Sequence, residues 1–415
     1  MPELQTGKQT TRCRACGHPL SVTFCDLGAT PLANAMLKSE TETETYYPLH
    51  ALVCDQCMLV QLVQYSTPAE IFSDYTYFSS YAQSWLAHAK DYSAKVIGRF
   101  GLDKNSFVVE LASNDGYLLK NFVAAGVPCL GIEPAKNVAE AAAAVGVPTL
   151  VEFFGKDLAQ RLAAEGKQVD LLVANNVLAH VPDLNDFVAG IKILLKQGGV
   201  ATIEFPHLLN LIRSVQFDTI YHEHFSYFSL LSLQRIFARH KLRVFDVEKL
   251  VTHGGSLRVF ACHEGDTRRE MEIVQKVIDE ERAFGLADLA TYRAFSAQAR
   301  RVKLDLVRFF VDAVSAGART ACYGAAAKGN TLLNYCGIGK DHISFAVDRN
   351  PHKQGRLLPG TRIPVFGPDH VAVERPDYLL ILAWNLKDEV MAQMQHIRSW
   401  GGRFVIPIPA VEIVN

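Results

Sequence analysis

Four cysteines in two closely spaced pairs are the feature that most constrains how this chain can fold. The pairs are Cys13-Arg-Ala-Cys16 and Cys54-Asp-Gln-Cys57. Two intervening residues let one tight turn direct both sulfur atoms to a point, and two such turns supply the four thiolates that suit zinc. We therefore predict a closed, structural zinc site, with residues 17–53 forming a looped hairpin or small subdomain.

Other readings of these cysteines remain open. A thioredoxin-like redox pair opens a helix after a strand, and neither pair has that context. His18 follows the first pair and could compete as a ligand. The other five cysteines are isolated in the sequence and are expected to be buried thiols, which suits a reducing compartment.

Length and charge exclude several classes of protein. At roughly 150 residues per domain, 415 residues predict two or three domains. The formal net charge is −1, whereas a general nucleic-acid binder carries a basic excess, so no nucleic-acid partner is expected. No apolar stretch is long enough for a bilayer, and the N-terminus lacks the apolar region of a secretory signal. We expect a cytoplasmic protein without a membrane partner.

Residues 106–133 have the pattern of a βαβ unit. Residues 106–111 predict a buried strand that runs into a polar turn ending at Gly116, residues 117–125 predict a helix, and residues 127–133 predict a second strand. Glu133 ends that second strand, where an acid can accept hydrogen bonds from both hydroxyls of a ribose.

The turn between the first strand and the helix favours one kind of cofactor. A pyrophosphate needs several close backbone N–H groups and glycines that let it approach, but this turn has one glycine. Glu110 and Asp115 instead suit a ligand that has no phosphate and carries a positive sulfonium. The sequence therefore favours S-adenosylmethionine over NAD, and a doubly wound domain with another ligand or none is the alternative.

Later strands add polar residues to the same crevice. Residues 169–176 predict a strand that ends in two amides, His180 follows it, and residues 200–205 predict the next strand. Ligands of such sheets lie outside the carboxyl ends of the strands. The cofactor-binding residues predicted from this placement are Glu110, Asn114, Asp115, Gly116, Glu133, Asn175 and Asn176.

Several of these motifs together resemble a known family. Glu110-Leu-Ala-Ser-Asn-Asp-Gly116, Glu133-Pro and Val177-Leu-Ala-His-Val-Pro-Asp183 resemble a class I methyltransferase. With the cysteine quartet and Tyr221-His-Glu-His-Phe-Ser-Tyr227, the chain from Cys13 onward resembles the sugar C-methyltransferases of deoxysugar biosynthesis. The resemblance implies methylation of the carbon next to the keto group of a nucleotide-linked 4-keto-deoxysugar, with dTDP as the nucleotide and C3 as the favoured carbon.

The histidine-rich segment is the predicted catalytic centre. The resemblance implicates Tyr221, Glu223 and His224 in catalysis. We expect His224 to remove the carbon-bound proton, because imidazole titrates near neutrality, and Tyr221 to assist at the keto group. His180 is the alternative base, with a structural role equally open. A metal site here is disfavoured because the HExxH spacing is absent, and a purely structural role stays open.

Residues 74–81 combine aromatic and hydroxyl groups just before a long predicted helix. They could form a hydrophobic staple and helix cap. The family resemblance favours a lid over the cofactor or substrate, with Tyr75, Tyr77 and Ser80 as binding residues.

The last third of the chain predicts a helix pair over residues 266–317 and then a second Rossmann-like domain. Before it, His253 and Arg258 could face the substrate, although Arg258 could simply be solvated. Residues 320–331 approach a Walker A loop, but Asn330 stands where its lysine belongs, which argues against an NTPase. We expect this domain to bind the nucleotide diphosphate, with Lys328 on phosphate and Asn330 near it; a degenerate duplicate used for packing is the alternative.

We thus expect an α/β chain of three parts. These are a zinc-binding domain (1–70), an S-adenosylmethionine-binding methyltransferase domain (71–245) and a Rossmann-like nucleotide-sugar domain (246–415). A monomer or small homo-oligomer is expected. The alternative functions are methylation of another small acceptor and oxidoreduction of a nucleotide sugar by the second Rossmann-like domain.

Overall fold

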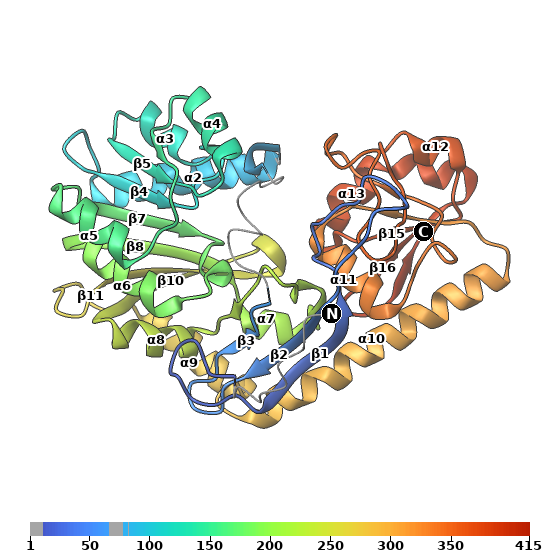
Figure 1. Cartoon of the computed structure of the whole chain (residues 1–415), viewed down its shortest axis with the longest axis horizontal. Coiled ribbons are helices and arrows are strands. Elements are labelled where there is room, and N and C mark those ends of the chain that lie inside the picture. Colours follow the sequence, from blue (N-terminus) through green and yellow to red (C-terminus); the bar gives the residue numbers. More distant parts are fainter. Residues whose placement is uncertain (1–10, 66–77, 82) are drawn as a thin grey trace.

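The computed structural model of this chain describes residues 11–65, 78–81 and 83–415. Its described strands form three sheets of four, seven and six strands. Figure 1 shows the seven-stranded sheet on one side and the six-stranded sheet on the other, with the blue strands β1–β3 near one end of both. The long helix α10 (Leu289–Ser315) runs past β1 to the C-terminal sheet, and its apolar side packs on β1.

The four-stranded sheet combines two distant parts of the sequence. Its antiparallel order is β1-β2-β3-β9, from β1 (Val22–Thr30), β2 (Tyr47–Val53), β3 (Val60–Leu62) and β9 (Ser226–Tyr227). The first two strands form the hairpin expected between the cysteine pairs. The fourth strand comes from the histidine-rich segment and pairs Tyr227 with Val60. The N-terminal sheet is therefore completed by the predicted catalytic region.

The seven-stranded sheet has the order β10-β11-β8-β7-β4-β5-β6. Its parallel strands are β4 (Val108–Leu111), β5 (Cys129–Ile132), β6 (Thr149–Leu150), β7 (Val169–Asn175) and β8 (Leu195–Pro206). Because helices cover both faces, the central strands are apolar at nearly every position, as in Val108-Val109. The chain order reverses between β4 and β7, and ligands of such sheets bind at the carboxyl ends beside that reversal.

The predicted boundary at residue 245 falls inside this sheet. It cuts β10 (Leu242–Leu250), and β11 (Ser256–His263) lies beyond it, yet both strands belong to the seven-stranded sheet. β11 pairs antiparallel with β8, so its addition covers the edge that β8 would otherwise expose. The sheet ends at His263 rather than before residue 246.

Strand β8 also starts earlier than the expected residue 200. Gly199 lies inside it, and a Cβ atom there would come 2.8 Å from the Val169 carbonyl oxygen. Gly199 therefore allows a close approach of β8 to β7, while Gly198 adopts a positive φ of 79°.

Helices cover the two faces of the sheet in separate groups. One core unites the strands with α5 (Lys156–Ala164), α6 (Leu184–Leu194), α8 (Leu230–Arg239) and α9 (Glu272–Phe284). The other face is covered by α2 (Gln83–Phe100), α3 (Leu119–Ala124) and α4 (Lys136–Ala144), while α7 (Leu208–Arg213) packs towards the N-terminal sheet. Asp183 caps α6 and Ser229 caps α8, as short polar side chains do at helix starts.

The C-terminal sheet has the order β14-β13-β12-β15-β16-β17, again with a reversal beside its first strand. The strands are β12 (Thr320–Tyr323), β13 (Ala346–Val347), β14 (Val365–Phe366), β15 (Tyr378–Ile381), β16 (Arg403–Ile406) and the antiparallel β17 (Glu412–Val414). Its helices are α11 (Ala327–Cys336), α12 (His370–Glu374) and α13 (Lys387–Gln393). The expected α/β architecture with a second Rossmann-like domain is confirmed, and α9 and α10 are the expected helix pair.

Across the described residues, no helix combines the length and apolar character needed to span a membrane.

A fully buried carboxylate joins α9 to the start of α8 and to His207, which follows β8. Glu281 of α9 is completely inaccessible. Its oxygens accept hydrogen bonds from the backbone N–H groups of Leu230 and Leu231 (2.6 and 2.8 Å) and from His207 Nε2 (2.7 Å). Glu281 thus satisfies the open N–H groups at the start of α8.

We expect Glu281→Gln to lower the thermal unfolding temperature of the chain. An amide replaces one acceptor oxygen by a donor, so a buried N–H group or the imidazole loses its partner, at a cost of about 1–3 kcal/mol. Differential scanning fluorimetry of Glu281→Gln against Glu272→Gln measures this, because Glu272 lies on the exposed face of the same helix. Equal unfolding temperatures for the two variants would contradict the role of Glu281.

Candidate active site

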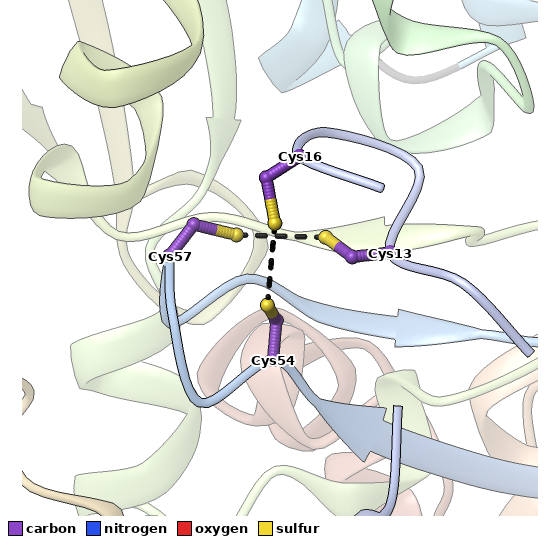
Figure 2. A group of neighbouring side chains, drawn as sticks. All are labelled: Cys13, Cys16, Cys54 and Cys57. Atoms are coloured by element: carbon purple, nitrogen blue, oxygen red, sulfur yellow. Dashed lines mark hydrogen bonds between the residues drawn. The ribbon is translucent and has the colours of Figure 1, made fainter. Parts of the chain in front are cut away.

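The four N-terminal cysteines converge on one point. Their Sγ atoms all lie within 4.8 Å of one another, and the Cys13–Cys57 and Cys16–Cys54 pairs are each 3.5 Å apart (Figure 2). A tetrahedral zinc ion with Zn–S bonds of about 2.3 Å sets its sulfur atoms about 3.8 Å apart, so this set fits zinc. Gln61 Nε2 donates a hydrogen bond to Cys13 Sγ (3.2 Å), as expected for a thiolate. All four positions are taken by protein ligands, which is the arrangement of a structural site.

The first cysteine turn is hydrogen-bonded to residues at the start of α6. The Arg14 guanidinium donates to the carbonyl oxygens of Pro182 (2.7 Å) and Leu62 (2.5 Å). Asn185 Nδ2 donates back to the Arg14 carbonyl (2.8 Å). Pro182 closely follows His180 in the sequence. The hydrogen bonds of Arg14 therefore connect the first cysteine turn to the segment that carries His180.

The turn after β4 is held in an unusual conformation by Glu133. Ala112, Asn114 and Gly116 all have positive φ angles, of 50°, 50° and 77°. The Asn114 N–H donates to Glu133 Oε2 and the Ala135 N–H to Oε1, both at 2.9 Å. Each carboxylate oxygen keeps a second lone pair, so Glu133 can still accept ribose hydroxyls.

The segment before α2 lies directly over this turn. Ser79 and Ser80 begin a 3₁₀ helix (Ser79–Tyr81), and their N–H groups donate to Asn114 Oδ1 (2.9 Å) and Asp115 Oδ2 (3.0 Å). Ser80 thus contacts the turn that is predicted to bind the cofactor, and its role in a lid stays a prediction. Tyr75 and Tyr77, the other two residues of that hypothesis, lie outside the described residues.

Three buried acids, Glu110, Asp115 and Glu133, lie at this edge of the seven-stranded sheet. Burial raises the pKa of Glu110 well above its usual value, despite a hydrogen bond from Tyr117, and the nearby carboxylates of Glu133 and Asp115 add to the rise. Burial likewise raises the pKa of Glu133. A cationic ligand would relieve both effects.

Buried polar atoms without partners among the described residues lie at the same edge. They are Ser113 Oγ, Asp115 Oδ1 and the amide atoms of Asn175 and Asn176. Buried polar groups normally have hydrogen-bond partners, so these atoms indicate a ligand. An acidic edge with a ribose acceptor fits S-adenosylmethionine, which Glu110, Asn114, Asp115, Gly116, Glu133, Asn175 and Asn176 would hold.

His224 is fixed in one tautomer. Its Nδ1–H donates to the Thr219 carbonyl (2.9 Å), which leaves Nε2 unprotonated in the neutral ring and able to accept from the Tyr221 hydroxyl (2.8 Å). The His180 ring packs edge-on at 4.7 Å between centroids. Burial and the neighbouring His180 hold the pKa of His224 well below its usual value. His224 is therefore a neutral imidazole at physiological pH, which is the basic form.

Glu223 is tied to the N-terminal part. Asn34 Nδ2 donates to Glu223 Oε1 (2.5 Å), and the loop that carries Asn34 continues onto the C-terminal domain, where Leu37 bridges Leu357. Burial raises the pKa of Glu223 to about 7, opposed by the hydrogen bond from Asn34. Glu223 can therefore donate or accept a hydrogen bond near neutral pH.

The C-terminal domain brings Lys328 to the same place. Lys328 Nζ is buried and lies 5.1 Å from the centre of the Trp384 ring, whose Nε1 donates to Asp218 Oδ2 (2.6 Å). Its charge lowers the pKa of both His224 and His253, although burial is the main cause in each. Lys328 thus belongs to the histidine cluster.

The other predicted substrate residues are placed differently. Asn330 is buried, and its Nδ2 donates to the Ala33 carbonyl (2.6 Å). His253 adopts a positive φ of 54° and packs on Trp85, and burial lowers its pKa to about 4. Substrate binding by Asn330 and His253 stays a prediction.

Arg258 is not solvated. It is 3% exposed, and its guanidinium donates to Glu204 (2.6 Å) and His88 (2.8 Å) and lies over the Tyr92 ring. Despite burial, which opposes it, His88 and Arg258 lower the pKa of Glu204. Arg258 therefore neutralises a buried acid, and its contact with substrate stays a prediction.

Sequence reasoning assigned no role to Asn34, Asp218 or Trp384. Asp218 lies inside the histidine-rich segment and Trp384 follows a strand end, so both had a local signal. Asn34 has none, because it reaches Glu223 only through tertiary structure.

Family models match most of the chain in three consecutive pieces. Residues 13–72 match a model described as "Putative zinc binding domain", residues 85–247 a methyltransferase domain, and residues 251–409 a C-methyltransferase C-terminal domain. The C-methyltransferase NovU of Streptomyces niveus is 37% identical over 405 residues, which cover 97% of this chain and 96% of that protein.

Two similar solved structures each cover less than half of this chain. A protein of Pyrococcus horikoshii is 14% identical and covers 47% of this chain and 97% of its own, with a TM-score of 0.37. Magnesium protoporphyrin IX methyltransferase of Synechocystis is 13% identical over 43% of this chain and 79% of its own, with a TM-score of 0.34. At these TM-scores the likeness supports no functional conclusion.

We expect one zinc ion per chain, and its removal to destabilise the N-terminal sheet. Elemental analysis should find zinc in purified protein, and a strong chelator should lower the unfolding temperature, because the hairpin then loses the crosslink between its two cysteine turns. Cys16→Ser should lose the metal, whereas Cys25→Ser, which replaces a buried thiol in β1, should retain it. Pure, folded protein without zinc would contradict this site.

We expect Glu133→Gln to weaken binding of S-adenosylhomocysteine about ten- to a hundred-fold in isothermal titration calorimetry. The amide loses the ionic acceptor of the ribose and the support of the turn, worth about 1.5–3 kcal/mol. Glu152→Gln is the control, because Glu152 is an exposed acid paired with Arg161. Equal affinities of the two variants would show that Glu133 does not bind the ribose of the cofactor.

Proposed function

This chain belongs to the C-methyltransferase family that carries an N-terminal zinc-binding domain, and from that premise we propose that it methylates a nucleotide-linked 4-keto-deoxysugar. The methyl donor is S-adenosylmethionine, and the acceptor is the carbon next to the keto group, with C3 favoured and dTDP as the nucleotide. The observation that carries the proposal is His224, a neutral imidazole whose tautomer is fixed and whose Nε2 faces the cluster of Tyr221 and His180.

His224 is the proposed base. The Thr219 carbonyl holds the proton of Nδ1, so the lone pair of the ring lies on Nε2. When Tyr221 turns its hydroxyl towards the keto oxygen, Nε2 takes the proton from the adjacent carbon, and the electron pair of the broken C–H bond moves into the enolate. His180 packs on His224, and burial lowers its pKa to about 4, so it is neutral near pH 7. Its one N–H is donated to the Glu223 backbone carbonyl, which leaves Nδ1 as the unprotonated ring nitrogen.

Tyr221 and Glu223 support this step. The Tyr221 hydroxyl donates to Nε2 before reaction, and in the proposed complex it stabilises charge on the keto oxygen instead. Glu223 is buried beside them and held by Asn34, which suits a hydrogen bond to a sugar hydroxyl.

The cofactor edge supplies the other half of the reaction. When bound, S-adenosylmethionine provides an electrophilic methyl group on a sulfonium. Glu133 would hold the ribose, and the acids Glu110 and Asp115 give the site the negative character that a sulfonium requires. Asn175 and Asn176, at the end of β7, offer amides on the side of His180.

The C-terminal domain is the proposed holder of the nucleotide. Together with a zinc-binding part over residues 1–70 and a methyltransferase part that extends through β11, it would enclose the sugar. Asn330, His253 and Arg258 stay as proposed substrate residues of this wall, and Tyr75, Tyr77 and Ser80 as those of the lid. A monomer or small homo-oligomer would suffice, because every group invoked comes from one chain.

We expect His224→Asn to abolish methyl transfer while leaving the affinity for S-adenosylhomocysteine within about three-fold, because loss of a general base costs about 10²–10⁴ in rate. The measurement is mass spectrometry of products formed from S-adenosylmethionine and a panel of dTDP-linked 4-keto-deoxysugars. A product heavier by one methylene identifies the acceptor.

His396→Asn is the matched control, because His396 is exposed on the C-terminal domain and far from this cluster in sequence. Full activity of His224→Asn would remove His224 as the base. Wild-type protein that binds cofactor but methylates no sugar of the panel would refute the proposed acceptor.

A further inference from the structure

Lys328 is delivered to the reacting centre by the fold of the C-terminal domain. It lies in the first turn of α11, which follows β12 and packs on the 3₁₀ helix Phe217–Thr219 of the histidine-rich segment. A Cβ atom on the adjacent Gly329 would come 2.8 Å from the Leu382 side chain, so the helix start is packed closely against the end of β15. This packing fixes where the lysine stem leaves the helix.

The ammonium group has an incomplete environment. Nζ is buried and makes no hydrogen bond to a described residue. The Trp384 ring lies 5.1 Å away and attracts the cation through its π face. Trp384 in turn donates to Asp218 Oδ2, while Asp218 Oδ1 has no hydrogen-bond partner among the described residues. No carboxylate of a described residue lies within 4.0 Å of the ammonium nitrogen, so the cation has room for a further anion.

A buried ammonium without hydrogen bonds is costly, so an unfilled donor here indicates a polar ligand. Two anions of the proposed substrate could fill it, the diphosphate and the enolate oxygen. The position of Lys328 separates them. The helix α11, which carries Lys328, packs on Phe217–Thr219, and the Thr219 carbonyl accepts the hydrogen bond from His224 Nδ1. Lys328 therefore leaves its helix close to the proposed base, on the methyltransferase side of the site. The proton that His224 removes comes from the carbon bonded to the carbonyl carbon, so the keto oxygen must lie close to His224 as well.

We propose that Lys328 binds the keto oxygen of the substrate and stabilises the enolate that forms when His224 removes the neighbouring proton. This inference rests on the proposed function and adds that the C-terminal domain supplies a catalytic group as well as a nucleotide site. The C–H electron pair moves to the oxygen, and the ammonium donates a hydrogen bond to it without giving up its proton. As the carbon attacks the methyl group, the carbonyl re-forms and Lys328 is left unchanged.

The other candidate donors cannot supply this charge. Burial lowers the pKa values of His180 and His253 to about 4, so both are neutral near pH 7. Tyr221 can share the keto oxygen with Lys328 once it turns away from His224, but its hydroxyl is a neutral donor and brings no charge. Arg258 is committed to Glu204 and His88. Burial lowers the pKa of Lys328 as well, but the nearby Asp218 carboxylate opposes this shift. Among the described groups of this cluster, Lys328 is the basic side chain that is not engaged in a direct ion pair.

The test is proton exchange, which separates enolate formation from methyl transfer. A dTDP-linked 4-keto-6-deoxyglucose is incubated in D₂O with protein and S-adenosylhomocysteine, and deuterium incorporation next to the keto group is followed by NMR. Lys328→Met removes the charge and keeps the length of the side chain, and Lys328→Arg keeps the charge. Lys276→Met is the control, because Lys276 is exposed on α9.

We expect Lys328→Met to reduce exchange at saturating sugar by about a hundred-fold or more, the size of effect that follows loss of one preorganised donor to an oxyanion. Its affinity for dTDP alone, measured by calorimetry, should stay within about three-fold of wild type. Lys328→Arg should retain more exchange than Lys328→Met, and it keeps the test decisive if the methionine variant does not fold.

Opposite results would assign Lys328 to phosphate. If Lys328→Met exchanges at the wild-type rate when saturated but binds dTDP about ten-fold more weakly, the enolate role is wrong. If wild-type protein itself catalyses neither exchange nor methylation of any sugar in the panel, the proposed function fails and this inference fails with it. Exchange by wild type that the methionine substitution leaves intact overturns this inference alone.

Discussion

The pairing of β9 with β3 is the contact on which the position of the proposed base depends. Val60 pairs with Tyr227, and the Leu62 N–H donates to the Phe225 carbonyl (3.0 Å), so the residues just after His224 are part of the N-terminal sheet. β3 begins shortly after Cys57. The cysteine cluster and the histidine are thus connected by a few residues of regular structure, and zinc can matter for the reaction through geometry without touching a substrate.

Burial is the second general constraint, because it sets the charge of the site. It lowers the pKa of His180, His224 and His253, so that three imidazoles, two of which are in direct ring contact, remain neutral. Charged imidazoles at such distances would repel one another. The same burial raises the pKa of Glu223 to about 7 and of Asp218 to about 6. The site therefore contains neutral imidazoles, which can accept a proton, and two acids that titrate near neutral pH.

The features that could be predicted from the sequence are those that depend on residues close together in the chain. Strands ending in Glu133 and Asn175 lie where apolar runs and the parallel-sheet rule place them, and the cysteine turns meet because their spacing leaves little choice. It did not predict that Asn34 reaches Glu223, or that Arg258 neutralises Glu204, because these contacts depend on how separate parts of the chain pack. That the strand after residue 245 joins the seven-stranded sheet was not predicted for the same reason, since it pairs with β8 and not with its sequence neighbours alone.

The two Rossmann-like sheets have opposite charge at the edges that contribute to the site. The methyltransferase edge carries Glu110, Asp115 and Glu133, and the C-terminal edge carries Lys328. A methyl transfer to an enolate needs a cationic methyl donor on one side and an anionic carbon nucleophile on the other. In the proposed reaction, a lysine among the three acids would neutralise the proposed sulfonium site, whereas a lysine on the opposite domain would stabilise the enolate without weakening that site. A second α/β domain thus lets one enzyme hold both charges, each beside groups of opposite sign.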